Sequence, residues 1–251
     1  MRFRNKIVLV TGASAGIGAD AAHAFAEEGA NVFLTARRKE LGESVAEGIR
    51  QKGGEATFFQ ADMGNRDEIA SMVQACLDTY GRLDVAFNNA GTDGAFFVDT
   101  HKHPEDAWDQ LLAVNLTGVW FCMRHEIQAM LKHGDGAIVN MASMAGVKGF
   151  AGSSGYAASK FGVVGITKAA ALEYASRGIR VNCVCPAVIQ TDMAEKIFHQ
   201  TEESRLATAA SHPIGRIGTA REVTNAVLWL ASSEASFVVG EALQIDGGLG
   251  A

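Results

Sequence analysis

Seven short apolar runs alternate with longer amphipathic segments along the whole 251-residue chain. Each run has the length of a buried strand, and the segments between the runs carry apolar residues at helical spacing. Strands and helices in alternation, joined by short loops, form a parallel sheet that helices cover on both faces. Because the chain has no linker, repeat or low-complexity tract, the sequence predicts one doubly wound α/β domain over residues 1–251. The expected strands are Ile7–Val10, Val32–Leu34, Thr57–Phe59, Val85–Phe87, Ala137–Val139, Val181–Cys185 and Ala242–Ile245, and the expected helices span 17–29, 39–52, 66–80, 105–133, 157–177 and 219–231.

The charge balance and the N-terminus narrow the class of protein. The formal net charge is −6 and charged residues make up 20% of the chain, so we expect no nucleic-acid partner. The first residues lead directly into the apolar run Ile7–Val10, which is too short for a signal peptide. No apolar stretch has the length of a membrane span. We therefore expect a cytoplasmic protein with no membrane partner.

The cysteines and histidines do not form a recognisable metal motif. A structural zinc site uses CxxC-like spacings with nearby histidines, and no such pair occurs here. We expect four buried free thiols, as in a reducing compartment, and no metal site. The stretch His101–Pro104 is expected to be a solvated loop before a helix. The four cysteines are Cys76, Cys122, Cys183 and Cys185.

The segment TGASAGIG, residues 11–18, places three glycines after the first expected strand and at the start of the first expected helix. A helix N-terminus presents unpaired N–H groups and the positive end of the helix dipole, which together favour an anion. Glycines let a pyrophosphate approach that backbone closely. Gly12, Gly16 and Gly18 therefore indicate a dinucleotide-binding loop, with a simple tight turn as the alternative.

A polar residue interrupts the apolar stripe of the expected helix 105–133. Asn115 falls on this stripe, so its amide needs buried hydrogen-bond partners. It is either a core asparagine bonded to a neighbouring backbone or part of an internal polar site. The apolar residues of the stripe are Trp108, Leu112, Val119, Met123, Ile127 and Met130.

A series of short motifs follows in a fixed order along the chain. They are Thr11-Gly12 with Gly16 and Gly18 (TGxxxGxG), Asn88-Asn89-Ala90-Gly91, Asn115, Ser143, Tyr156 with Lys160 (YAASK), Arg180-Val181-Asn182 and Ile245-Asp246-Gly247-Gly248. This ordered set, which spans nearly the whole chain, resembles the classical short-chain dehydrogenase/reductase family. The resemblance implies a Rossmann fold and hydride transfer between a nicotinamide cofactor and a substrate. One departure is Pro186-Ala187, where the family usually has Pro-Gly, so that a methyl group lies near the expected nicotinamide position.

The resemblance also implies the catalytic roles. Tyr156 exchanges a proton with the substrate oxygen, Ser143 holds that oxygen, Lys160 lowers the tyrosine pKa and binds the nicotinamide ribose, and Asn115 holds a relay water. Tyr156 and Lys160 lie four residues apart on an expected helix, so they share a face. An ammonium about 4 Å from a phenol, at an effective dielectric near 20, contributes roughly 4 kcal/mol, or about three pKa units. Desolvation opposes this effect, and the net expectation is a lowered Tyr156 pKa. Taken singly, the Tyr/Lys pair is also what an ordinary helix surface carries.

The end of the second expected strand bears on the choice of cofactor. Dinucleotide folds that bind NAD usually carry an acid there, whereas this chain has Ala36 followed by Arg37 and Arg38. The Arg37 guanidinium, directly after Ala36, can form charge-assisted bonds with a 2′-phosphate, so we expect NADP(H), with NAD(H) as the alternative if Arg37 and Arg38 are solvated surface charges. Asp62 resembles the family's adenine contact, or is a helix N-cap or a turn aspartate. The full expected cofactor set is Gly12, Ser14, Gly16, Ile17, Gly18, Arg37, Arg38, Asp62, Met63, Asn89, Ala90, Gly91, Tyr156, Lys160, Pro186, Ala187, Ile189, Thr191 and Met193.

The expected function is oxidoreduction between a secondary alcohol and a ketone, with a small carbonyl or alcohol as the substrate. A dinucleotide-binding sensor without turnover is the alternative, and an enoyl reductase is a further one because fold does not determine function. By analogy with the family, residues 92–100, 144–155 and the segment after Pro186 form the substrate pocket and suit an apolar or mixed substrate. The family is usually oligomeric, and Trp120 and Phe121 beside the main stripe are compatible with a homotetramer or homodimer. The apolar pocket candidates are Phe96, Phe97, Met144, Val147, Phe150, Val188, Ile189 and Phe198.

Overall fold

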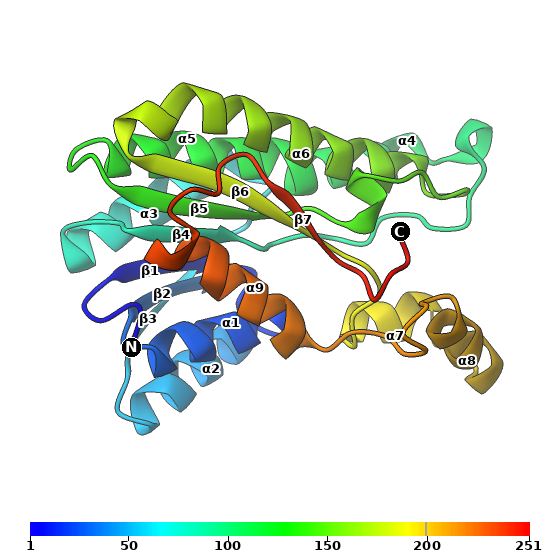
Figure 1. Ribbon diagram of the computed structural model, residues 1–251, viewed down its shortest axis with the longest axis horizontal. Helices are drawn as coiled ribbons and strands as arrows, with labels where there is room; N and C mark the ends of the chain where they lie inside the picture. Colours follow the sequence, from blue (N-terminus) through cyan, green and yellow to red (C-terminus); the bar gives the residue numbers. More distant parts are fainter. Residues whose placement is uncertain (199) are drawn as a thin grey trace.

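The computed structural model describes residues 1–198 and 200–251, whose strands form one parallel seven-stranded sheet in the order β3-β2-β1-β4-β5-β6-β7 (Figure 1). All seven strand predictions and the doubly wound fold class are confirmed, because every predicted run lies within an observed strand. The strand order reverses between β1 and β4, and such a switch point opens a crevice at the carboxyl ends of the strands. The strands are β1 Ile7–Thr11, β2 Asn31–Ala36, β3 Glu55–Gln60, β4 Val85–Asn88, β5 Gly136–Met141, β6 Ile179–Pro186 and β7 Ala242–Ile245.

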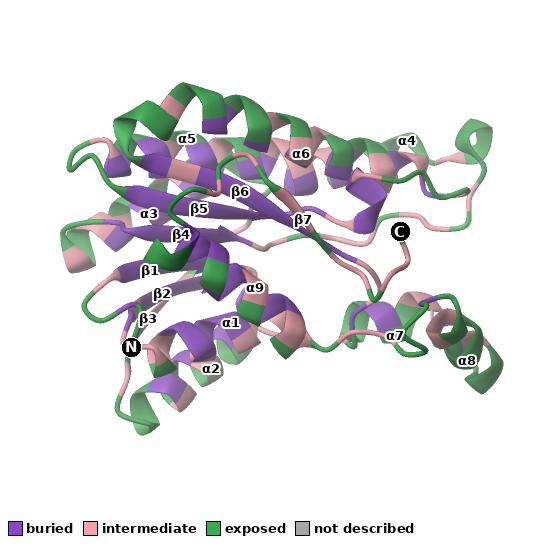
Figure 2. Ribbon diagram, viewed as in Figure 1, coloured by how far each residue is buried: buried purple, intermediate pink, exposed green. Residues whose placement is uncertain are grey.

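Helices cover both faces of the sheet, and the five inner strands are buried almost throughout, whereas the edge strands β3 and β7 are partly exposed (Figure 2). Leu9 belongs to the apolar core on the side of α3, α5 and α6, whereas Val8 and Val10 belong to the core on the side of α1, α2 and α9. Neighbouring residues of one strand are therefore both buried, which explains why the strands are continuous apolar runs without alternation. The flanking helices are α1 Gly16–Glu27, α2 Lys39–Gln51, α3 Arg66–Tyr80, α5 Val119–Met130, α6 Ser154–Tyr174 and α9 Ala220–Ala231.

The prediction of one regular helix over 105–133 is wrong. The segment consists of α4 Glu105–Leu112, a π-helical turn at Ala113–Gly118, and α5. A π turn adds one residue to the helix locally and is frequent at functional sites. Gly118 ends this turn where a β-carbon would overlap the carbonyl oxygen of Met63, so the close approach of the two backbones requires glycine. Periodicity does not reveal such a turn because the apolar stripe continues through it.

Two short helices that the sequence analysis did not predict follow β6. They are α7 Asp192–Phe198 and α8 Glu202–Ala210, and they lie beyond the carboxyl ends of the strands, apart from the helices that cover the sheet (Figure 1). The Thr201 side chain accepts a hydrogen bond from Ser204 N at 3.1 Å and caps α8. Both helices are short and mostly exposed, so they carry little of the apolar periodicity on which helix prediction depends.

The Arg180-Val181-Asn182 motif joins β6 to the end of α9. The Arg180 guanidinium donates to the carbonyl oxygens of Leu230 at 2.7 Å and Ser232 at 2.9 Å, where the helix leaves carbonyl groups unpaired. Asn182 donates to Val238 O at 2.9 Å. The motif is therefore structural, and it positions the chain that leads into β7.

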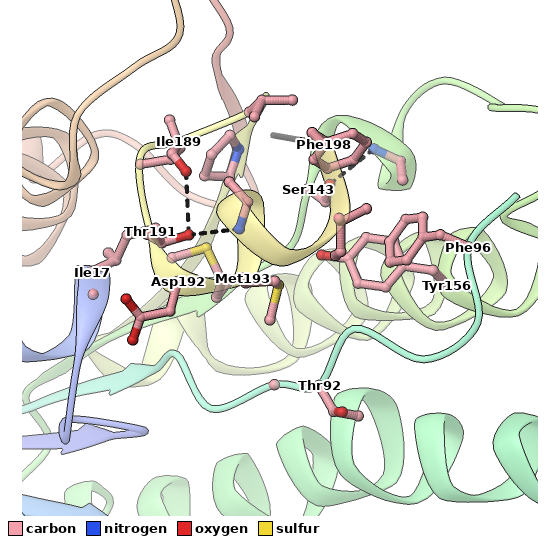
Figure 3. Close-up of a pocket in the computed structure, with 18 of the residues that line it drawn as sticks. Ile17, Thr92, Phe96, Ser143, Tyr156, Ile189, Thr191, Asp192, Met193 and Phe198 are labelled. Atoms are coloured by element: carbon pink, nitrogen blue, oxygen red, sulfur yellow. Dashed lines mark hydrogen bonds between the residues drawn. The ribbon is translucent and has the colours of Figure 1, made fainter. Parts of the chain in front are cut away.

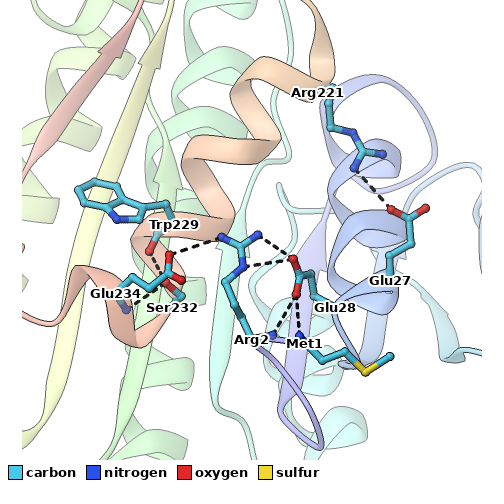
Figure 4. A network of polar contacts seen from close by, with 8 residues as sticks. All are labelled: Met1, Arg2, Glu27, Glu28, Arg221, Trp229, Ser232 and Glu234. Carbon is cyan, nitrogen blue, oxygen red and sulfur yellow. Dashed lines mark hydrogen bonds and ion pairs between the residues drawn. The ribbon is translucent and has the colours of Figure 1, made fainter.

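The first residues of the chain are tied to α1 and to the end of α9 by a polar network (Figure 4). Arg2 Nη2 lies 3.0 Å from Glu28 Oε1, and Arg2 N donates to Glu28 Oε2 at 2.9 Å. Arg2 Nη1 also lies 3.8 Å from Glu234 Oε2. Each exposed pair adds only about 0–1 kcal/mol, so the network orients the N-terminus more than it stabilises the fold.

Among the described helices, none is long and apolar enough to cross a membrane.

Candidate active site

A pocket of about 1080 Å³ opens at the carboxyl edge of the sheet, between the loops that follow β1, β2, β4, β5 and β6 and the two helices α7 and α8. Figure 3 shows part of its wall, with Ile17 from the glycine-rich loop on one side and Phe96 beside Tyr156 on the other. The pocket is thus elongated from the switch point of the sheet to an aromatic end. Expected cofactor residues that line it are Gly12, Ser14, Gly16, Ile17, Arg37, Arg38, Asp62, Met63, Asn89, Ala90, Gly91, Tyr156, Lys160, Pro186, Ala187, Ile189, Thr191 and Met193.

The glycine-rich loop leaves the first turn of α1 open to the pocket. Gly12 and Gly16 have φ values of +67° and +56°, which favour glycine, and a β-carbon on Gly12 would come within 2.7 Å of Ala90 Cα. The N-cap residue Ala15 provides no side-chain cap, so no side-chain oxygen of the cap competes for the first N–H groups of the helix. Asn89 Nδ2 holds the loop by donating to Thr11 O at 3.0 Å. This geometry fits a dinucleotide pyrophosphate, which needs bare backbone amides at a helix N-terminus.

Gly18 does not line the pocket, in contrast to its expected role as a cofactor contact. It is buried, and a β-carbon there would overlap Gly12 O and the side-chain amide of Asn89. Gly18 therefore allows α1 to pack against the loop, and it acts on the cofactor site through Gly12 and Asn89.

Two guanidinium groups stand at the end of β2, where Ala36 replaces the usual acid. Arg38 donates to Ser14 Oγ from Nε at 3.2 Å and from Nη2 at 3.0 Å, so it reaches across to the glycine-rich loop. Arg37 Nη1 lies 3.9 Å from Asp62 Oδ2. Both arginines line the pocket. Asp62 caps no helix here, because its Oδ1 accepts from Gly64 N at 2.9 Å in a turn and Asn65 caps α3.

Tyr156, Ser143 and Lys160 come together in the middle of the pocket. Tyr156 and Lys160 share one face of α6, with Lys160 Nζ 5.6 Å from the centre of the tyrosine ring. Lys160 Nζ also donates to Met141 O at 2.8 Å at the end of β5. Ser143 follows β5, and its Oγ accepts from Ala145 N at 3.1 Å. The three side chains are therefore held by the sheet edge and one helix.

The expectation of a lowered Tyr156 pKa is wrong for this structure. Burial raises the pKa of Tyr156 to about 12, although a hydrogen bond with the Ser143 side chain opposes the shift. Burial also lowers the pKa of Lys160 to about 8. Both shifts have the same first cause, because desolvation disfavours the charged forms, the phenolate of Tyr156 and the ammonium of Lys160.

Asn115 is fully buried in the π-helical turn and does not line the pocket. Its Oδ1 accepts from Thr92 N at 2.8 Å, and its Nδ2 donates to Thr92 O at 2.9 Å. A carboxamide has a second lone pair and a second proton, so each atom retains capacity for one more hydrogen bond. The buried partners predicted for this asparagine are thus the backbone groups of the loop after β4.

The aromatic end of the pocket includes most of the apolar residues expected there. Phe96, Phe97, Met144, Phe150, Val188, Ile189 and Phe198 line it. Val147 does not, because it packs against the core on the side of α6. Ala187 lines the pocket with an ordinary backbone, since Asn5 and Phe97 are the only non-glycine residues with positive φ in the described chain. The sequence analysis missed a polar group on and beside α7 and α8: Asp192, Gln200, Thr201, Ser204, Thr208 and Ser211.

Comparison with known proteins extends the similarity over the whole chain. A family model described as enoyl-(acyl carrier protein) reductase matches residues 12–250. Cyclohexanol dehydrogenase of Acinetobacter sp. (strain SE19) is 40% identical over 98% of this chain and 95% of its own length. The 3-oxoacyl-[acyl-carrier-protein] reductase FabG of Thermotoga maritima is 40% identical over 99% of both chains.

Solved structures agree with these relatives. Levodione reductase has a TM-score of 0.94 and 34% identity, covering 98% of both chains. A variant of actinorhodin polyketide ketoreductase, solved with NADPH, has a TM-score of 0.94 and 38% identity, covering 98% of this chain and 97% of its own. The fold, the pocket and the relatives agree: the chain belongs to the classical short-chain dehydrogenase/reductase family, whose members are oxidoreductases that bind a nicotinamide cofactor.

Proposed function

We propose that the protein is an NADP(H)-dependent oxidoreductase that interconverts a secondary alcohol and a ketone, with Tyr156 as the acid and base. The observation that carries this proposal is the meeting of Tyr156, Ser143 and Lys160 between the glycine-rich loop and the aromatic end of one pocket. The names of the relatives support it, since cyclohexanol is a secondary alcohol and two other names denote ketone reduction. A proton donor beside a hydroxyl group that binds an oxygen favours C=O chemistry over reduction of a C=C bond.

Ketone reduction needs a proton for the carbonyl oxygen, and Tyr156 holds one at neutral pH, as a phenol does at its ordinary pKa of about 10 and also with its pKa raised to about 12 by burial. The Ser143 hydroxyl donates a hydrogen bond to the substrate oxygen and orients it. As the proton leaves Tyr156, the Lys160 ammonium stabilises the phenolate that forms. When bound, the reduced nicotinamide supplies the hydride, and its oxidised form accepts one in the reverse direction. Gly12, Gly16 and the first turn of α1 would hold its pyrophosphate.

Return of the proton to Tyr156 is the proposed role of the region around Asn115. A β-carbon on Gly91 would lie 3.3 Å from Asn115 Oδ1 and 3.8 Å from Lys160 Nζ, so glycine keeps the space between these two groups open. A water molecule in that space would have polar partners on both sides, as a stable buried water requires. Asn115 and Lys160 therefore support a relay from the pocket to Tyr156.

NADP(H) selectivity is proposed to depend on Arg38 more than on Arg37. Arg38 meets Ser14 at the glycine-rich loop, whereas Arg37 faces Asp62. Replacing Arg38 with alanine should raise the Kd for NADPH by about 10- to 150-fold, because a charge-assisted hydrogen bond contributes about 1.5–3 kcal/mol. The Kd for NADH should change by less than about 3-fold, because NADH lacks the 2′-phosphate.

Titration of nicotinamide fluorescence measures both constants. Arg50→Ala is the matched control, since Arg50 lies at the far end of α2 and pairs with Glu47. Equal losses of NADPH and NADH affinity in Arg38→Ala would mean that Arg38 supports the glycine-rich loop and does not bind the 2′-phosphate.

Absorbance of the reduced cofactor across a panel of ketones tests the reaction itself. Tight NADPH binding with turnover of a ketone is the expected result. Tight binding without turnover of any carbonyl or alcohol would instead support a dinucleotide sensor.

We also propose a homotetramer or homodimer, formed through α5 and α6. Trp120, Phe161 and Leu172 expose large apolar side chains on these helices, and Leu172 is 86% exposed. Light scattering at micromolar concentration should give the mass of a tetramer or a dimer, and Leu172→Glu should lower that mass, because an interface does not bury an unpaired carboxylate. Leu206→Glu, an exposed position on α8, is the control that should keep the original mass. A monomeric wild type would contradict the proposal.

A further inference from the structure

We infer that the aromatic end of the pocket selects compact, uncharged carbocyclic ketones and the corresponding alcohols, with the ring packed against Phe96. This inference rests on the proposed function and names the substrate class for the same site. It draws on three observations: an aromatic wall beside Tyr156, a backbone that holds this wall in place, and the pairing of nearby charges with one another.

The wall joins the loop after β4 to α7. The ring centres of Phe96 and Tyr156 lie 5.0 Å apart, and Phe198 from α7 meets Phe96 edge-on at 6.0 Å. Phe97 meets Phe198 at 6.1 Å with the ring planes 89° apart. Figure 3 shows the rings of Phe96 and Tyr156 side by side at one end of the pocket. Rings tilted against each other in this way present faces and edges to a compact apolar body.

The backbone holds Phe96 in this position. The next residue, Phe97, has a φ of +61°, a conformation that costs a non-glycine residue about 1–3 kcal/mol and persists only where its surroundings determine it. Val98 N donates to Gly152 O at 3.1 Å, and a β-carbon on Gly152 would approach Phe97 Cα to 2.8 Å. The loop is therefore pinned to the segment just before Tyr156, and Phe96 is placed relative to the reacting hydroxyl.

The nearby charges do not provide a site for an anionic substrate. Lys196 Nζ on α7 lies 2.7 Å from Asp93 Oδ2 on the loop after β4, so this cation is already paired. Asp192 points toward Ile17 and away from Phe96 (Figure 3). The other charged residues of the described lining are Arg37, Arg38 and Asp62 near the glycine-rich loop, and Lys160 beneath Tyr156. A carboxylate at the aromatic end would lose its hydration without gaining a cation, which is strongly unfavourable.

A rigid ring suits this wall better than an open chain of the same carbon number. The ring has little conformational freedom to lose on binding, whereas each rotatable bond of a chain is immobilised at a cost. The ring also presents a compact apolar face to Phe96, and its carbonyl oxygen can reach Tyr156 and Ser143. At equal carbon number, the preorganisation of the ring and its contact with Phe96 both favour the cyclic ketone over the open-chain ketone.

Three ketones test the inference with NADPH. Two have six carbons, cyclohexanone and the open-chain 2-hexanone, and the third, 4-oxocyclohexanecarboxylate, adds a carboxylate to the cyclohexanone ring. We expect kcat/KM for cyclohexanone to exceed that for 2-hexanone by about 10-fold and that for the carboxylate by about 100-fold. Phe96→Ala should lower kcat/KM for cyclohexanone by about 10-fold and for 2-hexanone by less than about 3-fold, because only the ring loses its packing surface. Phe198→Ala should also lower the ratio of kcat/KM for cyclohexanone to that for 2-hexanone, because it removes the ring that packs against Phe96.

Phe237→Ala is the matched control, since Phe237 is fully exposed and lies outside the pocket. Thermal unfolding midpoints show whether each variant is folded. If Phe96→Ala does not fold, the inference is tested by the wild-type ratios of kcat/KM among the three ketones and by Phe198→Ala. A wild type that turns over 2-hexanone or the carboxylate as well as cyclohexanone would overturn the inference alone, as would an equal loss for all three ketones in Phe96→Ala. Absence of NADPH-dependent turnover of every ketone would overturn the proposed function, and the inference with it.

Discussion

Replacing Tyr156 with phenylalanine is expected to lower kcat by about 1000-fold, because general acid–base catalysis contributes about 10²–10⁴-fold. The variant removes one oxygen atom, the atom that exchanges a proton with the substrate. The ring that packs against Phe96 at 5.0 Å remains, and so does the hydrogen bond of Lys160 to Met141 O. The Kd for NADPH should therefore change by less than about 3-fold, because no pyrophosphate or 2′-phosphate contact involves the phenol.

Reduced-cofactor absorbance measures kcat for this variant, and nicotinamide fluorescence measures Kd. Tyr174→Phe is the matched control, because Tyr174 ends the same helix and packs against Arg177. It should leave both constants unchanged. A Tyr156→Phe enzyme that retained a tenth or more of the wild-type kcat would exclude Tyr156 as the proton donor, and the search would pass to Ser143.

Glu126→Gln is expected to stabilise the protein, and the gain in unfolding free energy should grow as the pH rises. Glu126 is fully buried on α5, where Asn88 Nδ2 donates to its Oε2 at 2.9 Å. Its Oε1 and the Oδ1 of Asn88 are both buried acceptors without a donor among the described residues. A proton on Glu126 provides such a donor, and burial correspondingly raises its pKa to about 8. Glutamine supplies an N–H donor permanently and has nearly the same shape.

The direction of this pH dependence follows from the pKa of Glu126 in the unfolded chain, which is near the ordinary 4.5. Below that value Glu126 is protonated in both states, so glutamic acid suffers no penalty. Between pH 4.5 and about 8 the unfolded chain releases a proton that the folded protein keeps, which destabilises the folded wild type by about 1.36 kcal/mol per pH unit. The advantage of Glu126→Gln should therefore grow by about 3 kcal/mol from pH 5 to pH 8.

Urea unfolding of both proteins at pH 5 and pH 8, at one protein concentration, measures this difference. The exposed Glu173→Gln on α6 is the control, and its effect should stay within about 0.5 kcal/mol at both pH values. A Glu126→Gln advantage that is the same at both pH values would mean that the folded protein holds Glu126 ionised.

The sequence predicted best where one local pattern determines one structure. The five inner strands are buried on both faces and form continuous apolar runs, and short apolar runs also marked the partly exposed edge strands β3 and β7, so all seven were found. The ordered motifs likewise indicated Tyr156, Ser143 and Lys160 as candidates, although sequence alone gives no distances between them. Prediction failed where structure departs from regular periodicity, as in the π turn around Asn115 and in the short exposed helices α7 and α8.

Glu126 was also missed, although a signal for it exists. It lies one turn after Cys122 on a helix side that is otherwise apolar, which is the sequence mark of a buried acid. Only the tertiary structure shows that its partner is Asn88, from a strand 38 residues earlier in the chain.

By itself, the sequence determined the order of the strands and of the helices that flank them, the family and the candidates for the catalytic set, because these depend on local pattern and spacing. The tertiary structure alone decided the direction of the Tyr156 pKa shift, since desolvation depends on how deeply a group is packed and not on its neighbours in sequence. It also decided that Arg38 reaches Ser14, that Gly18 serves packing, and that Phe198 meets Phe96. Each of these contacts joins residues from different elements, and short-range sequence patterns carry no information about such distances.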